Sequence, residues 1–176
     1  MTVFRQFPTD KKTRFTALCA LSVALLFVLS FFEGIINFNF GVPGVKLGLS
    51  NLVVVLSLCT GDFWYSFLIT VLKILINSFF YGGFSSFLFT ALGSIASFFS
   101  MWLLKAFLKE RVTAVGVSAL GGFFHITAQY FASFLVMQTD AVFKMLPVAI
   151  LLTLFLSVFV GLIAQYIIKG WYKNES

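Results

Sequence analysis

Long apolar segments, interrupted by very few charges, dominate this sequence. Of its 176 residues, 60% are hydrophobic and only 10% are charged. A soluble domain of this size has about 45–50% apolar and roughly 25% charged residues, because its surface must face water. The composition therefore excludes a soluble globular enzyme, a disordered chain and a nucleic-acid-binding protein. It predicts an all-α, polytopic integral membrane protein.

Six apolar segments are candidate membrane spans, each of which needs roughly 20 residues to cross about 30 Å of hydrocarbon. Their approximate ranges are 15–36, 47–60, 63–81, 84–108, 116–137 and 145–168. The second range is short and contains Ser50 and Asn51, so it is either a short buried helix or a re-entrant segment. We expect residues 1–176 to form a single transmembrane domain, with residues 1–14 as a basic cytoplasmic N-terminus.

The distribution of cations favours six spans over five. With six, the outer side carries only Lys46 and Lys144, and the other flanking cations lie on the cytoplasmic side. The cytoplasmic set is then Arg5, Lys11, Lys12, Arg14, Lys105, Lys109, Arg111, Lys169 and Lys173. The net charge of +6 is thus explained by cations that set the orientation in the membrane, and it does not indicate a nucleic-acid-binding surface. We expect a multi-pass protein of the cell membrane with both termini in the cytoplasm.

The sequence offers no pattern for metal, cofactor or ATP chemistry. Cys19 and Cys59 lie in apolar stretches without a nearby CxxC or histidine partner, so they are interpreted as packing residues. No phosphate-binding loop of the ATPase type is present. We therefore expect no bound metal, no cofactor and no enzymatic activity.

A few polar residues fall within the apolar segments, where an ionisable side chain costs about 2.5–3.5 kcal/mol and needs a reason. Two pairs lie four residues apart, and each pair shares one helix face. The candidate substrate-binding residues are Glu33, Lys46, Asn51, Lys73, Asn77, His125 and Gln129.

With the N-terminus inside, these residues all fall at mid-membrane or in the outer half. Donors and acceptors at one depth on several helices indicate a cavity open to the outside. Lys46, Lys73 and a protonated His125 outweigh Glu33, which favours a small anionic or amide-rich ligand. The many Phe residues on the same spans would suit an aromatic or isoprenoid body, and thus an amphipathic ligand.

Structural alternatives remain open for most of these positions. Asn77 and Gln129 are equally well explained as helix-packing residues that hydrogen-bond a neighbouring helix, and packing is a less favoured alternative for His125. Asn51 could cap the backbone of a short helix, and Glu33 could be a counter-ion for Lys73 or contact water outside. Lys73 is the hardest to explain structurally, because it lies too deep for its ammonium to reach the interface easily.

Small residues give a second signal on the first span. Ala17, Ala20 and Ala24 share one face, and Ala20 and Ala24 form a small-xxx-small pattern that allows another helix to approach closely. The approaching helix belongs either to this protein or to a partner.

Four sequence features together resemble one membrane-protein family. They are PGVKLGLSN at 43–51, the cation at Lys73, FYGG at 80–83 and GG-x-x-H-x-x-x-Q at 121–129. The pattern resembles the Gx transporter family, also labelled heptaprenyl diphosphate synthase component I. That family is similar to the substrate-binding S components of energy-coupling factor (ECF) transporters.

The resemblance implies a six-helix S component that captures a small molecule and docks, through Ala20 and Ala24, on a coupling transmembrane subunit driven by ATPases. The family's second label implies an alternative, a non-catalytic membrane component that assists polyprenyl diphosphate or menaquinone synthesis. A secondary transporter is a third hypothesis. Synthase chemistry itself is disfavoured, because the six Asp and Glu form no aspartate-rich motif to hold Mg²⁺ and diphosphate.

Overall fold

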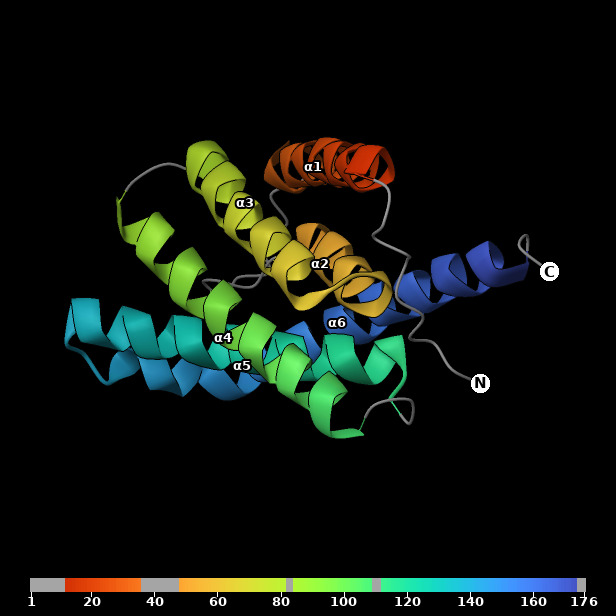
Figure 1. Ribbon diagram of the computed structural model, residues 1–176. Helices are drawn as coiled ribbons and strands as arrows, with labels where there is room; N and C mark the ends of the chain where they lie inside the picture. The colour runs from red at the N-terminus through yellow and green to blue at the C-terminus, as the bar shows by residue number, and fades with distance from the viewer. Residues whose placement is uncertain (1–11, 36–47, 82–83, 109–111, 174–176) are drawn as a thin grey trace.

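The fold was analysed in a computed structural model that describes residues 12–35, 48–81, 84–108 and 112–173. All regular structure in these ranges is helical, and the elements match the predicted segments closely (Figure 1). The helices are α1 (Lys12–Ile35), α2 (Leu49–Thr60), α3 (Phe63–Tyr81), α4 (Phe84–Leu108), α5 (Ala114–Met137) and α6 (Ala141–Lys173).

Three of the described helical stretches are long and apolar enough to cross a membrane. They are Phe87–Leu108, Ala114–Met137 and Ala141–Gly170. The apolar stretches Leu18–Glu33, Leu49–Thr60 and Phe63–Phe79 are shorter than 18 residues. The all-helical class and a membrane association are thus supported. Six spans were expected, and three of the described helices are long and apolar enough to be complete spans.

The short helix α2 lies at the centre of the bundle. It contacts each of the other five helices, and all of its 12 residues except Leu49, Leu56 and Thr60 are buried. At 1.5 Å per residue, 12 residues extend only about 18 Å, well short of the hydrocarbon thickness. The doubtful second segment is therefore a short buried helix, the first of the two forms expected from the sequence.

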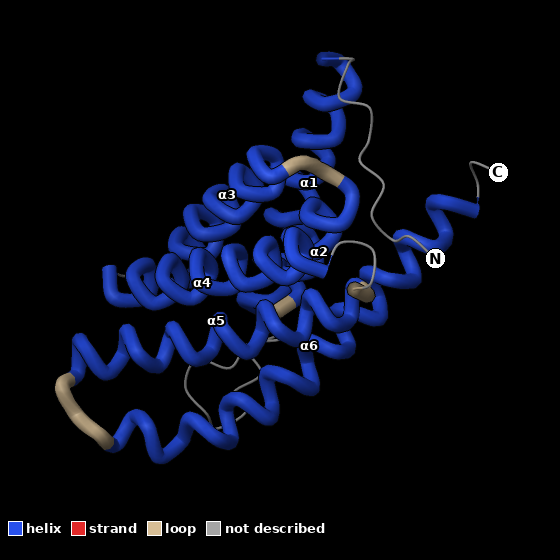
Figure 2. Tube along the Cα trace, turned by 60° about the horizontal axis from the view of Figure 1, so that its bottom comes forward, coloured by secondary structure: helices blue, strands red, loops and turns tan. Residues whose placement is uncertain are grey.

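Helices α4, α5 and α6 form the most closely packed part of the molecule. Figures 1 and 2 show α5 and α6 side by side along much of their length, and α4 packs against α5. Glycines permit this approach: a Cβ on Gly121 would overlap the Met101 side chain, and one on Gly122 would overlap Ser157. Small residues thus act here within the chain, as they commonly do between membrane helices.

Two apolar clusters form the core. The larger one joins all six helices through residues such as Leu26, Leu58 and Phe98 and includes Cys59, which packs as predicted. The smaller one joins α5 and α6 around Ile126 and Tyr130. Large apolar side chains also cover the outside of the helices, for example Phe79 and Phe155, which are 83% and 74% exposed. Such a surface suits lipid and not water.

Helix α1 lies at the edge of the bundle and packs against α2 and α3. Its inward face carries Leu26, Ser30 and Glu33, all buried. Ala20 and Ala24 lie on the opposite, exposed face. Among the described helices, therefore, none covers the small-residue pair predicted to dock a partner.

Because α5 and α6 approach each other closely at Gly122, adding a single methyl group there should lower the stability of the protein. Gly122→Ala should lower the melting temperature by an amount equivalent to about 1–3 kcal/mol, because the added Cβ overlaps Ser157. The measurement is thermal unfolding in one detergent.

Gly170→Ala is the matched control, since nothing lies within 4 Å of a Cβ added there. The double variant Gly122→Ala/Ser157→Gly removes the overlap and should recover most of the loss. Equal stability of Gly122→Ala and Gly170→Ala would contradict the packing described.

Candidate ligand-binding site

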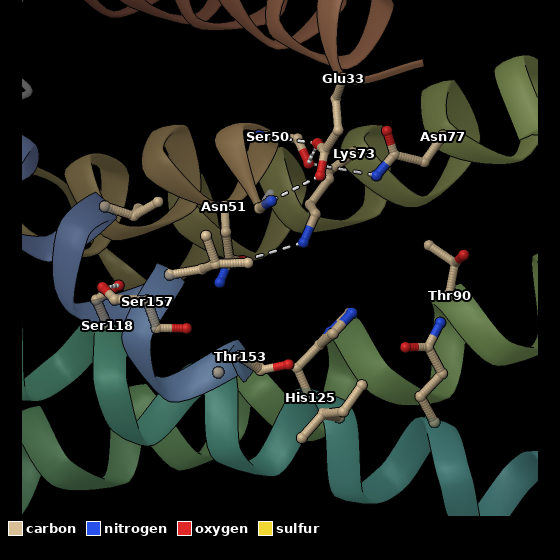
Figure 3. A pocket seen from close by; sticks show the side chains of 16 residues that line it. Glu33, Ser50, Asn51, Lys73, Asn77, Thr90, Ser118, His125, Thr153 and Ser157 are labelled. Carbon is tan, nitrogen blue, oxygen red and sulfur yellow. Dashed lines mark hydrogen bonds between the residues drawn. The ribbon is translucent and has the colours of Figure 1, made fainter. Parts of the chain in front are cut away.

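A polar cavity of about 50 Å³ lies inside the bundle, between the two apolar clusters (Figure 3). All six helices or their ends contribute to its wall. The lining residues are Glu33, Gly48, Ser50, Asn51, Lys73, Asn77, Thr90, Ser118, Gly122, His125, Ile126, Gln129, Thr153, Leu156, Ser157 and Val160. About 10–15 Å³ of such volume is enough to hold one water molecule, so the cavity has room for several waters or for a small polar group.

Six of the seven residues predicted to bind substrate line this cavity. They are Glu33, Asn51, Lys73, Asn77, His125 and Gln129. The seventh, Lys46, lies outside the described residues. The structure therefore brings the dispersed polar residues together, and their contacts distinguish residues that shape the cavity from residues able to contact a ligand.

Glu33 holds the N-terminus of α2. Its Oε1 accepts the backbone N–H of Gly48 at 2.7 Å, and its Oε2 accepts the N–H and the hydroxyl of Ser50 at 3.3 and 3.0 Å. Gly48 is the N-cap residue at φ 72°, a conformation that glycine adopts without strain. The carboxylate thus satisfies free N–H groups at the positive end of the helix dipole. Both of its oxygens are already engaged in this role, which the sequence did not suggest.

Lys105 occupies the opposite end of α2. Its ammonium donates to the carbonyl of Leu58 at 2.5 Å and, more weakly, to that of Gly61 at 3.5 Å. A cation there matches the negative end of the helix dipole. The short helix is therefore held at each end by a charged side chain from a neighbouring helix, α1 or α4.

Lys73 and Asn51 form the polar contact between α3 and α2. The Lys73 ammonium donates to Asn51 Oδ1 at 3.0 Å, and both side chains are at least nine-tenths buried. Asn51 thus binds the lysine through its side chain and is not the N-cap residue of α2. One turn further along α3, Asn77 Nδ2 donates to Ser50 Oγ at 3.4 Å. The start of α2 is consequently tied to α3 as well as to α1.

Helices α5 and α6 supply the opposite wall. Gln129 and Thr153 are buried, and neither Gln129 Oε1 nor Thr153 Oγ1 has a hydrogen-bond partner in the structure. The His125 ring packs against α4 at Gly93, where a Cβ would come within 3.0 Å of the imidazole. Buried polar atoms without partners are rare in proteins. Their location around a cavity indicates a place for water or for a polar ligand.

Five hydroxyl residues of the wall were missed by the sequence reasoning. They are Ser50, Thr90, Ser118, Thr153 and Ser157. Helical spacing was a signal for three of them. Thr90 lies on one face of α4 with the buried Ser94 and Ser97, and Thr153 and Ser157 are buried on one face of α6. In membrane helices this polar periodicity marks the inward face, as apolar periodicity does in soluble helices.

The charges of the described wall nearly balance. Glu33 supplies one negative charge and Lys73 one positive charge, so the net positive cavity expected from the sequence depends on His125 and on Lys46. Among the described residues, no group of three or more His, Cys, Asp or Glu gathers to hold a metal ion. Directed hydrogen bonds from hydroxyl, amide and ammonium groups therefore dominate the chemistry of this wall.

An all-helical, membrane-associated bundle with a buried polar cavity is the class of protein that the fold and the site define. The family model described as heptaprenyl diphosphate synthase component I matches residues 21–167, and the chain belongs to that family. The family name describes one component of a larger assembly. No curated protein and no solved structure matches the chain.

The capping contacts of Glu33 predict a graded loss of stability. Glu33→Ala leaves the N–H groups of Gly48 and Ser50 without their acceptor, at about 1–3 kcal/mol for each buried group. Glu33→Gln keeps one acceptor oxygen but loses the charge, so its loss should be smaller. Melting temperatures in detergent should fall in the order wild type, Gln, Ala. An Ala variant as stable as wild type would rule out the capping role.

Proposed function

We propose that this protein is the substrate-capture subunit of an ECF-type importer, which binds a small molecule in the polar cavity from the outer side of the membrane. The observation that carries the proposal is the buried cavity whose wall includes Lys73, Asn51, Asn77, His125 and Gln129. A buried lysine at this depth is expensive in a purely structural role. In this proposal all six helices cross or enter the membrane, and both termini are cytoplasmic.

The position of the cavity along the helices supports capture from outside. It is lined by the end of α1, the start of α2 and the second half of α3. In the proposed orientation all three regions face the outer leaflet. The opposite end of the bundle holds the larger apolar cluster and Lys105, which together close the inner side.

A second candidate function is favoured by the family name. As a component of a heptaprenyl diphosphate synthase assembly, the protein would be a non-catalytic membrane subunit that assists polyprenyl diphosphate or menaquinone synthesis. The two functions differ in what the cavity must hold. An importer subunit needs a water-soluble ligand there, whereas a synthase component would bind an isoprenoid or none.

Removing the buried lysine tests the capture function. Lys73→Met should weaken retention of a small molecule that co-purifies with the wild-type protein, detected as a mass increment by native mass spectrometry of the gently solubilised protein. The expected loss of affinity is roughly tenfold or more, since hydrogen bonds to charged groups contribute about 1.5–3 kcal/mol.

Lys169→Met, at an exposed position on α6, is the matched control and should keep the adduct. Retention of the same adduct by Lys73→Met would argue against the proposed site. An isoprenoid adduct would favour the synthase-component function.

The exposed face of α1 is the proposed docking surface for the coupling subunit. Ala20→Leu/Ala24→Leu should abolish co-purification of the transmembrane partner and its ATPases, because the bulky side chains prevent close helix approach. Ala106→Leu, at an exposed alanine on α4, is the control and should leave co-purification unchanged. Undiminished co-purification with the double variant would exclude this docking mode.

A further inference from the structure

We infer that the cavity selects an uncharged group that carries both hydrogen-bond donors and acceptors, of the carboxamide or lactam type, in preference to a carboxylate or a phosphate. The inference rests on the proposed ligand-binding function and adds a chemical class to it. Its basis is that two charged residues, Glu33 and Lys73, fix the orientation of two asparagine amides in the wall.

The hydrogen bond between Ser50 and Glu33 has a fixed direction. Backbone N–H groups can only donate, so the contacts from Gly48 and Ser50 make both Glu33 oxygens acceptors. Oε2, which already accepts the Ser50 N–H, also accepts the Ser50 hydroxyl at 3.0 Å, so the hydroxyl is the donor in this contact.

The direction of the Ser50 hydrogen bond in turn fixes the orientation of the Asn77 amide. The single hydroxyl proton of Ser50 is committed to Glu33, so Ser50 Oγ can only accept from Asn77. The Asn77 amide must then turn its Nδ2 toward Ser50, as observed at 3.4 Å. Its Oδ1 is left as a buried acceptor without a partner in the structure, on a side chain that is 4% exposed.

The Lys73 ammonium fixes the orientation of the second amide, that of Asn51. The Lys73 ammonium can only donate, so Asn51 must present Oδ1 to it, as observed at 3.0 Å. Asn51 Nδ2 is then left as a donor, and in Figure 3 the Asn51 side chain extends from α2 toward the cavity. The α2 and α3 wall therefore offers a fixed donor and a fixed acceptor.

The opposite wall carries two more buried groups without partners, Gln129 Oε1 and Thr153 Oγ1. A hydroxyl can donate or accept, so Thr153 suits either kind of ligand, and the demand for a donor comes from the amide oxygens. A carboxylate or phosphate group without protons brings acceptors alone, and it would leave Asn77 Oδ1 unsatisfied, because Ser50 prevents that amide from turning. A carboxamide brings two N–H donors and one carbonyl acceptor, and can therefore satisfy both kinds of group in the wall.

The inference can be tested with matched small probes that share a methyl group and differ in the polar head. Acetamide, acetate and the methylphosphonate dianion are titrated against the purified protein at a pH above the second ionisation of methylphosphonate, and binding is measured by saturation-transfer NMR. Acetamide should bind roughly tenfold more tightly than either anion, because only the anions leave a buried acceptor unsatisfied. Tighter binding of acetate or methylphosphonate, or no binding of acetamide, would overturn the inference.

Ser50→Ala tests the chain of hydrogen bonds itself. The variant keeps the backbone N–H that Glu33 accepts, but it frees the Asn77 amide to turn and present its NH₂ group. The preference for acetamide over acetate should therefore fall by about threefold or more, consistent with the loss of one modest hydrogen bond. An unchanged preference would overturn the proposed relay.

Ser57→Ala is the control on the same helix, because the Ser57 hydroxyl donates to the Val54 carbonyl and does not line the cavity. It should leave the preference at the wild-type value. Preferential binding of an anion that is lost in Lys73→Met would overturn the ligand class while leaving the capture function intact. The two proposals can thus fail separately.

Discussion

The position of α2 depends on the satisfaction of its two ends, and the rest of the site depends on α2. A 12-residue helix extends only about 18 Å, so both of its ends fall within the thickness of the bundle, away from bulk water. Backbone groups in such a setting must find partners within the protein. Glu33 supplies the acceptor at the N-terminus and Lys105 the donor at the C-terminus. The signs of both charges match the helix dipole, so each contact combines a hydrogen bond with a favourable electrostatic interaction.

The same arrangement accounts for polar residues in an otherwise apolar core. Once α2 is held, Ser50 and Asn51 lie beside α3, where they contact Asn77 and Lys73. Those contacts orient the amides and leave unsatisfied atoms at the edge of a small cavity. Helices α5 and α6 close this cavity from the other side, and their glycines allow the close packing that does so. The buried charges, the capping of α2 and the cavity wall therefore depend on one another.

The charges of the cavity wall can be compared with what a prenyl diphosphate ligand would need. A diphosphate group is neutralised by several cations or by carboxylate-bound Mg²⁺. The described wall carries one lysine whose ammonium already contacts Asn51, and its carboxylate is committed to α2. A site of this kind is better suited to a neutral polar ligand than to a prenyl diphosphate head group. The physical chemistry of the described wall thus disfavours a direct part in prenyl transfer, and it is compatible both with capture of a small molecule and with a non-catalytic synthase component.

Much of the architecture could be predicted from the sequence, because apolar segment length and the scarcity of charge restrict a chain to helices in lipid. The six helical segments, the short second helix and six polar residues around the cavity were accessible in this way, since a polar residue in hydrocarbon must turn inward. Five hydroxyl residues of the same wall were missed. The roles of the six polar residues were not accessible. Glu33 looked like a ligand contact or a counter-ion, but it caps a helix 15 residues further along the chain. Hydrogen-bond direction depends on which groups meet across helices, and only the tertiary structure decided those contacts.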